Sequence, residues 1–276
     1  MNWFIPAIFA SLFWGVGQTL IKKGLTDVSP FMTNLLSAGF SFLLYVSFAL
    51  IGGVNWNFFP SILLFGFLAN LPNFIFPYVI EKADISLSGT VLATYPVYTI
   101  ILSLLFLKES LNPVQVLGIL AIITGMFLIA KPEGKRFKFS QWVIWAVIGA
   151  MIIGLGDFIG KVTLTRFDLN SFILAFAVGA IPSLAVFRLF DKSKLGFGKM
   201  TKNSWISVLG NLISPVGLLL LFVAFSKGPA SLASPVASTY PVIILILAYF
   251  YLKEKITKVQ LFGILTVTSG IVLVAI

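Results

Sequence analysis

The sequence contains neither cysteine nor histidine. Without cysteine the chain forms no disulfide and no thiolate metal site. Without histidine it lacks the commonest general base and the commonest metal ligand of proteins. An enzyme acting on lipid-linked substrates would need clustered titratable side chains, and here the acids are scattered between apolar segments. We therefore expect no enzyme: no catalytic residues, no metal and no cofactor.

Charged residues are also scarce, at 10% of 276 residues, whereas an average soluble domain carries roughly 25%. Apolar residues make up 59% of the chain, more than a soluble fold of this size can bury, so lipid is the expected solvent. The net charge of +10 resides in short connectors, as in cytoplasmic loops that face anionic headgroups. The expected partner of this charge is the lipid bilayer, and no nucleic acid.

Ten apolar segments are long enough to span a membrane, which takes about 20 residues. They cover residues 3–22, 30–52, 59–80, 85–107, 112–130, 141–163, 171–190, 205–226, 230–252 and 257–276. The sequence therefore predicts an all-α membrane protein with ten transmembrane helices.

The fourth and fifth segments recur as the ninth and tenth. Residues 82–129 align without a gap to residues 227–274, and 20 of the 48 pairs are identical. Both copies contain T-Y-P-V, then L-K-E, then V-Q followed by G-I-L. Internal duplication of membrane spans is typical of carriers that expose a central site alternately to each side.

The remaining helices repeat more faintly. Gly15, Gly17 and Lys22 of the first segment correspond to Gly154, Gly156 and Lys161 of the sixth, and L-A-N-L of the third corresponds to L-G-N-L of the eighth. Five helices in each half force the second half to enter from the opposite side. The expected domains are inverted five-helix repeats, residues 1–130 and 141–276, joined by a connector at 131–140.

Lysine and arginine are distributed unevenly between the connectors. The first, third, fifth, seventh and ninth connectors, with the adjoining helix ends, hold 15 of the 19 basic residues. The positive-inside rule then places these connectors in the cytoplasm and both termini outside.

Polar residues within apolar segments are the candidate binding site, since such side chains usually face the bundle interior or a cavity. The two T-Y-P-V copies place Thr94 and Tyr95 at the same depth as Thr239 and Tyr240, and the candidates here are Thr94, Tyr95, Tyr240 and Ser238, which directly precedes the second copy. The prolines Pro96 and Pro241 are expected to kink their helices as hinges and to free a carbonyl one turn earlier. Alternatively, each proline only shapes its helix and takes no part in binding the solute.

The other candidates lie on four more segments. We expect the solute to be bound by Thr94, Tyr95, Ser238 and Tyr240 together with Trp14, Gln18, Asn70, Asn73, Tyr78, Asp157, Asn211 and Ser214. An Asn amide offers a donor and an acceptor, but hydrogen bonding between helices explains it equally well. Trp14 fits either the wall of a cavity or plain packing.

Asp157 is the one acid well inside a segment, and its counterpart in the first half is Gln18. Three interpretations stay open. Lys161 lies one helical turn further on, in good geometry for an ion pair. Alternatively, Asp157 binds an amine of the solute, or it carries a coupled proton.

These motifs resemble a known family. The F-W-G near the start, the proline-bearing fourth segment that runs into L-K-E, and the Q-x-x-G-I-L of the fifth are similar to those of EamA-type transporters of the drug/metabolite transporter superfamily. The resemblance implies two inverted five-helix repeats, with a cavity lined by the first, third, fourth, sixth, eighth and ninth helices. It also implies termini in the cytoplasm, the reverse of the charge count.

We therefore expect a secondary transporter in the cytoplasmic (inner) membrane of a prokaryote that moves a small-molecule solute, namely an amino acid or related metabolite, by export. A sugar uptake carrier, a lipid-carrier flippase and an intramembrane enzyme are the alternatives, in that order. No G-x-x-x-x-G-K-[ST] sequence is present, so ATP is not the expected driver. One chain holds both halves, so a monomer suffices.

Overall fold

A computed structural model describes residues 2–24, 28–81, 91–130, 141–192, 201–252 and 256–276. The regular elements in this part of the chain are helices, and their bounds are as follows. They are α1 (Phe4–Gly24), α2 (Pro30–Gly52), α3 (Phe59–Asn70), η1 (Leu71–Ile75), α4 (Phe76–Glu81), α6 (Tyr95–Phe106), α7 (Pro113–Ala130), α8 (Gln141–Leu164), α9 (Leu169–Phe190), α10 (Lys202–Lys227), α11 (Ala230–Ala237), α12 (Tyr240–Leu252) and α13 (Lys258–Ala275).

Within the described residues, eight spans are long and apolar enough to cross a membrane, and α6 and α7 add two shorter apolar helices. This confirms the expected all-α membrane protein of ten helices. Part of the fourth predicted segment, residues 85–90, and the 131–140 connector lie outside the described residues.

Two predicted helices are interrupted in the structure. The segment at 59–80 changes from α3 to the short 3-10 helix η1 and then to α4, with Pro72 in the 3-10 part. The segment at 230–252 breaks between Ala237 and Tyr240, so Pro241 occupies the first turn of α12. Proline is tolerated in the first turn, where its missing N–H would have no partner within the helix.

The same break precedes α6, in which Pro96 lies in the first turn. Thr94 and Thr239 have identical roles at these breaks: each hydroxyl donates to the carbonyl three residues earlier, Val91 O at 2.7 Å and Val236 O at 2.8 Å. Within the described residues, each predicted kink is therefore a short turn immediately before a helix that begins with Tyr-Pro.

Side-chain caps set several helix starts. Thr257 and Gln260 form a capping box at α13, and Asn112 and Gln115 form the equivalent pair of hydrogen bonds at α7. The repeated V-Q of the sequence is therefore a helix start.

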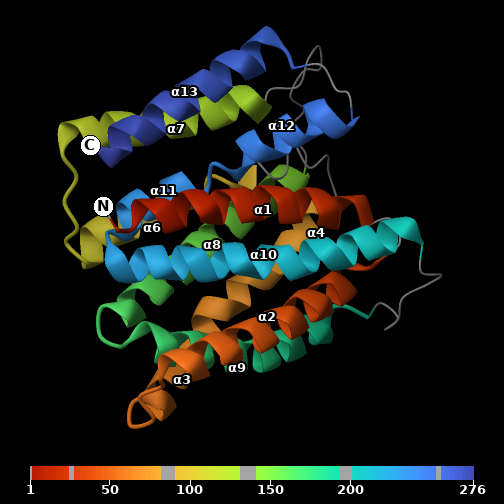
Figure 1. The fold of residues 1–276 in the computed structure, drawn as a ribbon, viewed down its shortest axis with the longest axis vertical. Helices are drawn as coiled ribbons and strands as arrows, with labels where there is room; N and C mark the ends of the chain where they lie inside the picture. The colour runs from red at the N-terminus through yellow and green to blue at the C-terminus, as the bar shows by residue number, and fades with distance from the viewer. Residues whose placement is uncertain (1, 25–27, 82–90, 131–140, 193–200, 253–255) are drawn as a thin grey trace.

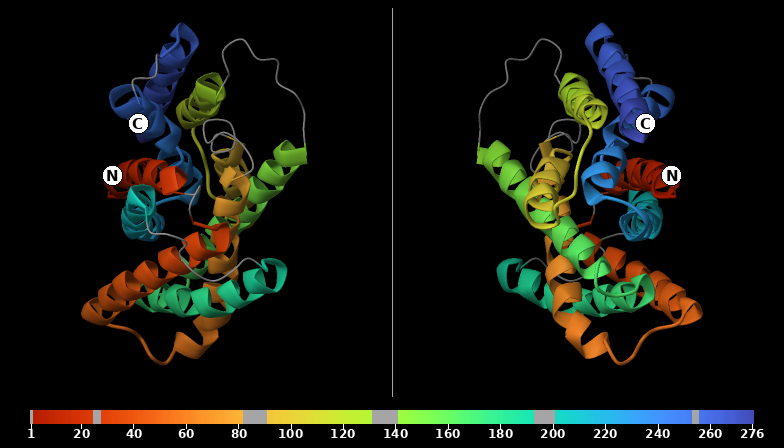
Figure 2. Two further views of the ribbon diagram at one scale, coloured as in Figure 1. Left: turned by 90° about the vertical axis from the view of Figure 1, so that its right-hand side faces the viewer. Right: turned by 90° about the vertical axis from the view of Figure 1, so that its left-hand side faces the viewer.

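α7 and α13 pack together at one end of the molecule, away from α2, α3 and α9 (Figure 1; both views of Figure 2). Their crossing is close because it is made by glycines. A Cβ on Gly118 would lie 2.8 Å from Gly270 O, and one on Gly263 would lie 2.8 Å from Gly125 O. Small residues allow such backbone contact between membrane helices.

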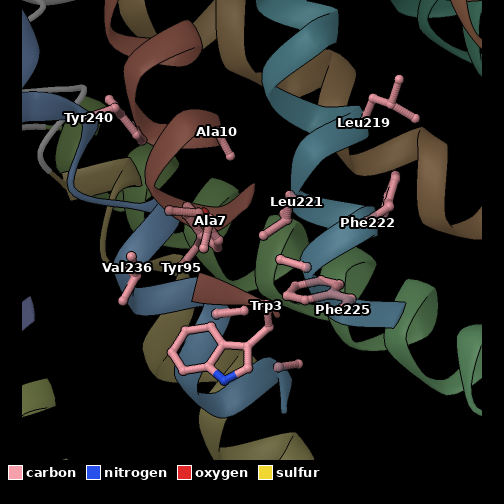
Figure 3. Packing of buried hydrophobic residues seen from close by; sticks show 14 of the residues in the cluster. Trp3, Ala7, Ala10, Tyr95, Leu219, Leu221, Phe222, Phe225, Val236 and Tyr240 are labelled. Atoms are coloured by element: carbon pink, nitrogen blue, oxygen red, sulfur yellow. The ribbon is translucent and has the colours of Figure 1, made fainter. Parts of the chain in front are cut away.

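α1 lies beside α10 across the middle of the molecule, and both chain termini lie on one side (Figure 1). The largest core cluster extends through most of the described helices, and one part of it lies where α1, α10 and α11 meet. It includes Trp3, Ala7, Phe222, Phe225 and Val236, which Figure 3 shows together.

Candidate functional site

A cavity of about 130 Å³ lies between α1, α2, α4, α6, α8, α10 and α12. Its walls are mainly apolar, with polar groups at a few positions, as is usual for small-molecule sites. The volume is large enough to hold several water molecules. Eight of the predicted binding residues line it: Trp14, Gln18, Asn73, Tyr95, Asp157, Asn211, Ser214 and Tyr240.

Ten of the twenty lining residues form pairs that correspond between the two halves of the sequence. The pairs are Trp14 with Ile153, Gln18 with Asp157, Asn73 with Ser214, Pro77 with Leu218 and Tyr95 with Tyr240. The cavity therefore lies where equivalent positions of the two halves face each other.

Four predicted binding residues do not line the cavity, and each has a structural partner. Asn70 donates to Phe176 O of α9 at 2.9 Å, and the Tyr78 hydroxyl donates to Asp191 at 2.7 Å. Thr94 holds its turn, and the hydroxyl of Ser238 donates to Pro235 O at 2.8 Å.

Asp157 is buried, with 5% of its surface exposed, and it accepts a hydrogen bond from the Ser234 hydroxyl at 3.2 Å. The ion pair with Lys161, one of the three interpretations left open, is not formed. The ammonium of Lys161 donates instead to Phe225 O and Gly228 O, each at 2.7 Å. These carbonyls lie at the C-terminal end of α10, where the helix leaves acceptors without partners, so they compete successfully for the lysine.

Several polar atoms at the cavity are buried and lack a protein hydrogen bond. They are Gln18 Oε1, Asn211 Oδ1, Thr33 Oγ1 and Ser214 Oγ. The amide nitrogen of Asn211 is bound to Ser207 O at 2.9 Å, which leaves its oxygen as the free atom. Buried polar atoms are normally satisfied, so these oxygens are available for water or a solute.

Aromatic rings form another part of the wall. Trp14 packs edge-on against Tyr240, with ring centroids 6.2 Å apart. The Tyr45 hydroxyl donates to Pro215 O at 2.8 Å and so joins α2 to α10. The rings give the cavity rigid sides.

Sequence reasoning missed the contribution of α2, which is Thr33, Asn34, Ser37, Ser41 and Tyr45. Thr33, Ser37, Ser41 and Tyr45 recur every four residues and so share one helix face. That spacing is a visible polar stripe in an otherwise apolar segment, and it could have identified α2 as a lining helix. Asn34 donates to Phe74 O at 2.8 Å, which holds this face against η1.

No three of the described acidic side chains converge in a way that could hold a metal ion. The arrangement is suited to reversible binding by hydrogen bonds and ring contacts. Fold and cavity together define a multi-pass membrane protein with an internal cavity that carries polar groups at a few positions.

The EamA-like transporter family matches residues 1–131 and again residues 140–276. The chain belongs to this family, and its biochemical class is therefore that of membrane transporters.

Three relatives are informative. An uncharacterized transporter of Archaeoglobus fulgidus is 25% identical over all of this chain and 97% of its own length. An uncharacterized protein of Methanocaldococcus jannaschii is 30% identical over 49% of this chain and 96% of its own length. A probable terminal-alkyne amino-acid exporter of Streptantibioticus cattleyicolor is 28% identical over 68% of this chain and 63% of its own.

A solved crystal structure of 17% sequence identity superposes with a TM-score of 0.77, covering all of this chain and 99% of the other. At this identity the match concerns the fold.

Proposed function

We propose that the protein is a secondary transporter that exports an amino acid or a related small metabolite across the cytoplasmic membrane of a prokaryotic cell. The observation that carries the proposal is the internal cavity, half of whose lining residues occupy corresponding positions of the two halves. Carriers built from repeats bind their solute at such an interface, near the bilayer midplane. The choice of an amino acid is supported by the relative named as a probable amino-acid exporter.

The two halves, residues 1–130 and 141–276, are proposed to be inverted repeats. Contacts between helices support this proposal, because when two helices pack together, their counterparts in the other half also pack together. α1 packs on α10 as α8 packs on α3, and α12 packs on α1 as α6 packs on α8. The Methanocaldococcus jannaschii relative has about half the length of this chain and supports the same division.

Alternating access is supported by a difference between the two ends of the site. Toward the first connector the cavity is lined by the hydroxyls of α2. Its counterpart α9 contributes Phe172 and Phe176, which are fully buried with Phe222 of α10. The Phe172 and Phe222 centroids are 4.9 Å apart, so packed rings occupy the space beside α9 that corresponds to the cavity beside α2. Rocking the halves would exchange the open and the filled end.

The working unit is proposed to be a monomer, because one chain supplies both halves of the site. A coupled proton is the proposed driving ion. Asp157 is the acid that could carry it, since among the described residues it is the acid lining the cavity.

Reconstitution into liposomes tests the proposal. Labelled amino acids and labelled sugars are loaded separately, and exchange is measured with and without an imposed pH gradient. The expected result is amino-acid exchange above that of empty liposomes, accelerated by the gradient. Movement of sugars alone would support the sugar carrier, and movement of neither class would contradict the proposal.

A further inference from the structure

The charge balance of the cavity shows which chemical group it is built to bind. Asp157 is the acid among the described lining residues, and no described lysine or arginine lines the same space. Lys161, one turn away, is held by two backbone carbonyls and forms no ion pair with Asp157 within the described part of the chain. A buried carboxylate is stable only when a cation or a proton neutralises it.

Two of the unpaired polar atoms at the cavity can only accept a hydrogen bond, whereas the hydroxyls of Thr33 and Ser214 can also donate one. Gln18 Oε1 and Asn211 Oδ1 are buried carbonyl oxygens without a hydrogen-bond partner. An ammonium group has three donors and no acceptor, so it matches one carboxylate and two amide oxygens. A carboxylate or phosphate of a ligand would instead find like charge at Asp157 and lone pairs on the amides.

The aromatic wall adds to the same preference. Trp14, Tyr95 and Tyr240 line the cavity, and Trp14 meets Tyr240 edge-on. The faces of such rings attract a cation. The apolar side chains Ile153 and Leu218 complete the wall and suit an aliphatic side chain of the solute.

We propose that the cavity recognises its solute by a protonated primary amine, which binds to Asp157 and to the amide oxygens of Gln18 and Asn211. The proposal rests on the proposed transport function and identifies the chemical group by which the site selects. A carboxylate elsewhere in the solute is then accommodated by neutral donors, such as the hydroxyls of Ser37 and Ser41 on α2.

Binding to the purified protein tests this separately from transport. The probes are the twenty amino acids, their amides and their N-acetyl derivatives, and the measurement is the ligand-induced increase in Tm. At least one free amino acid or amino-acid amide is expected to raise the Tm of the native protein. Its N-acetyl derivative, which has lost the charge, is expected to need at least a tenfold higher concentration for the same increase in Tm. This comparison requires no variant.

The variant Asp157→Asn has the same shape without the charge and is expected to bind the same amine at least tenfold more weakly, because charge-assisted hydrogen bonds are the stronger ones. Asp168→Asn is the matched control. Asp168 caps α9 by accepting from the backbone N–H of Ser171 at 2.8 Å, and asparagine caps equally well. Equal elution volumes on size exclusion show that both variants fold.

Equal binding of amines and N-acetyl derivatives would overturn the proposal, and so would unchanged amine binding by Asp157→Asn or no binding by any free amine. Amino-acid flux that survives Asp157→Asn unchanged would uphold the transport function and reject the amine site. Amine binding without any flux would uphold the amine site and reject the transport function.

Discussion

The ammonium of Lys161 in α8 donates a hydrogen bond of 2.7 Å to Gly228 O, and this contact caps the C-terminus of α10. A second bond to Phe225 O completes the cap of two carbonyls that the helix leaves without partners. Because Lys161 does not line the cavity, replacing it should change the stability of the protein and not its binding of solute.

Replacing Lys161 with methionine keeps the apolar stem and removes both hydrogen bonds. We expect the free energy of unfolding to fall by about 1–3 kcal/mol, the usual effect of leaving part-buried acceptors unpaired. The Tm in detergent should decrease by several degrees. Lys227→Met, at the exposed end of α10, is the matched control and should leave the Tm unchanged. Equal Tm values for the two variants would show that the cap contributes nothing.

Glu109, in the connector between α6 and α7, fixes the start of α11. Its carboxylate accepts the backbone N–H groups of Ala230 and Ser231 at 3.0 and 2.9 Å. Because two donors lose their partner, Glu109→Ala should lower the Tm, whereas Glu109→Gln, which keeps one acceptor oxygen, should lower it by less. The exposed Ser110→Ala variant is the control for a change in the same connector. An Ala variant as stable as the Gln variant would contradict the capping role.

The glycine crossing of α7 and α13 should tolerate no side chain. A Cβ on Gly118 would lie 2.8 Å from Gly270 O, so Gly118→Ala must push two backbones apart. Overpacking of this kind typically destabilises by about 1–3 kcal/mol. Gly39→Ala in α2 meets nothing within 4 Å and should be neutral or slightly stabilising, because alanine favours the helix. Thermal unfolding of both variants checks the difference, and similar values would contradict a tight crossing.

Part of this arrangement could be predicted from the sequence, because the repeat marks both helix starts and close contacts. The V-Q and G-I-L motifs recur since Gln115 and Gln260 cap helices, while Gly118 and Gly263 make the crossing. The spacing of Asp157 and Lys161 did not predict their partners, because an i, i+4 pair shows only that contact is possible. The competing acceptors, at Phe225 and Gly228, come from a distant helix.

The two asparagines show a second limit of the sequence. Asn70 and Asn211 occupy corresponding positions in similar motifs, and nothing local distinguishes them. In the structure Asn70 donates to α9 and lies outside the cavity lining, whereas Asn211 borders the cavity, although the side-chain oxygen of each is buried without a protein hydrogen bond. Their roles differ because the cavity extends toward α2 and the equivalent space beside α9 is filled by phenylalanine rings.

This difference predicts opposite effects of the same substitution. Asn211→Ala should raise the KM of transport several-fold with little change in Tm, because it removes an oxygen offered to the solute. Asn70→Ala should lower the Tm with little change in KM, because it removes an interhelical hydrogen bond of about 0.6–2 kcal/mol. Flux kinetics and thermal unfolding of both variants test the pair. The same change in KM for both would show that the free oxygen of Asn211 is irrelevant.

The polar stripe of α2 provides a test of the access route. Ser37 lines the cavity, whereas Ser47 of the same helix is exposed on the outer surface of the bundle. Ser37→Leu adds bulk and removes a hydroxyl within about 130 Å³ of space, so transport should stop while the protein remains folded. Ser47→Leu makes the same change toward lipid, where an apolar side chain is favourable, and should transport normally. Full activity of the Ser37 variant in the liposome assay would show that the solute does not pass along α2, and the cavity would then lose its assigned role.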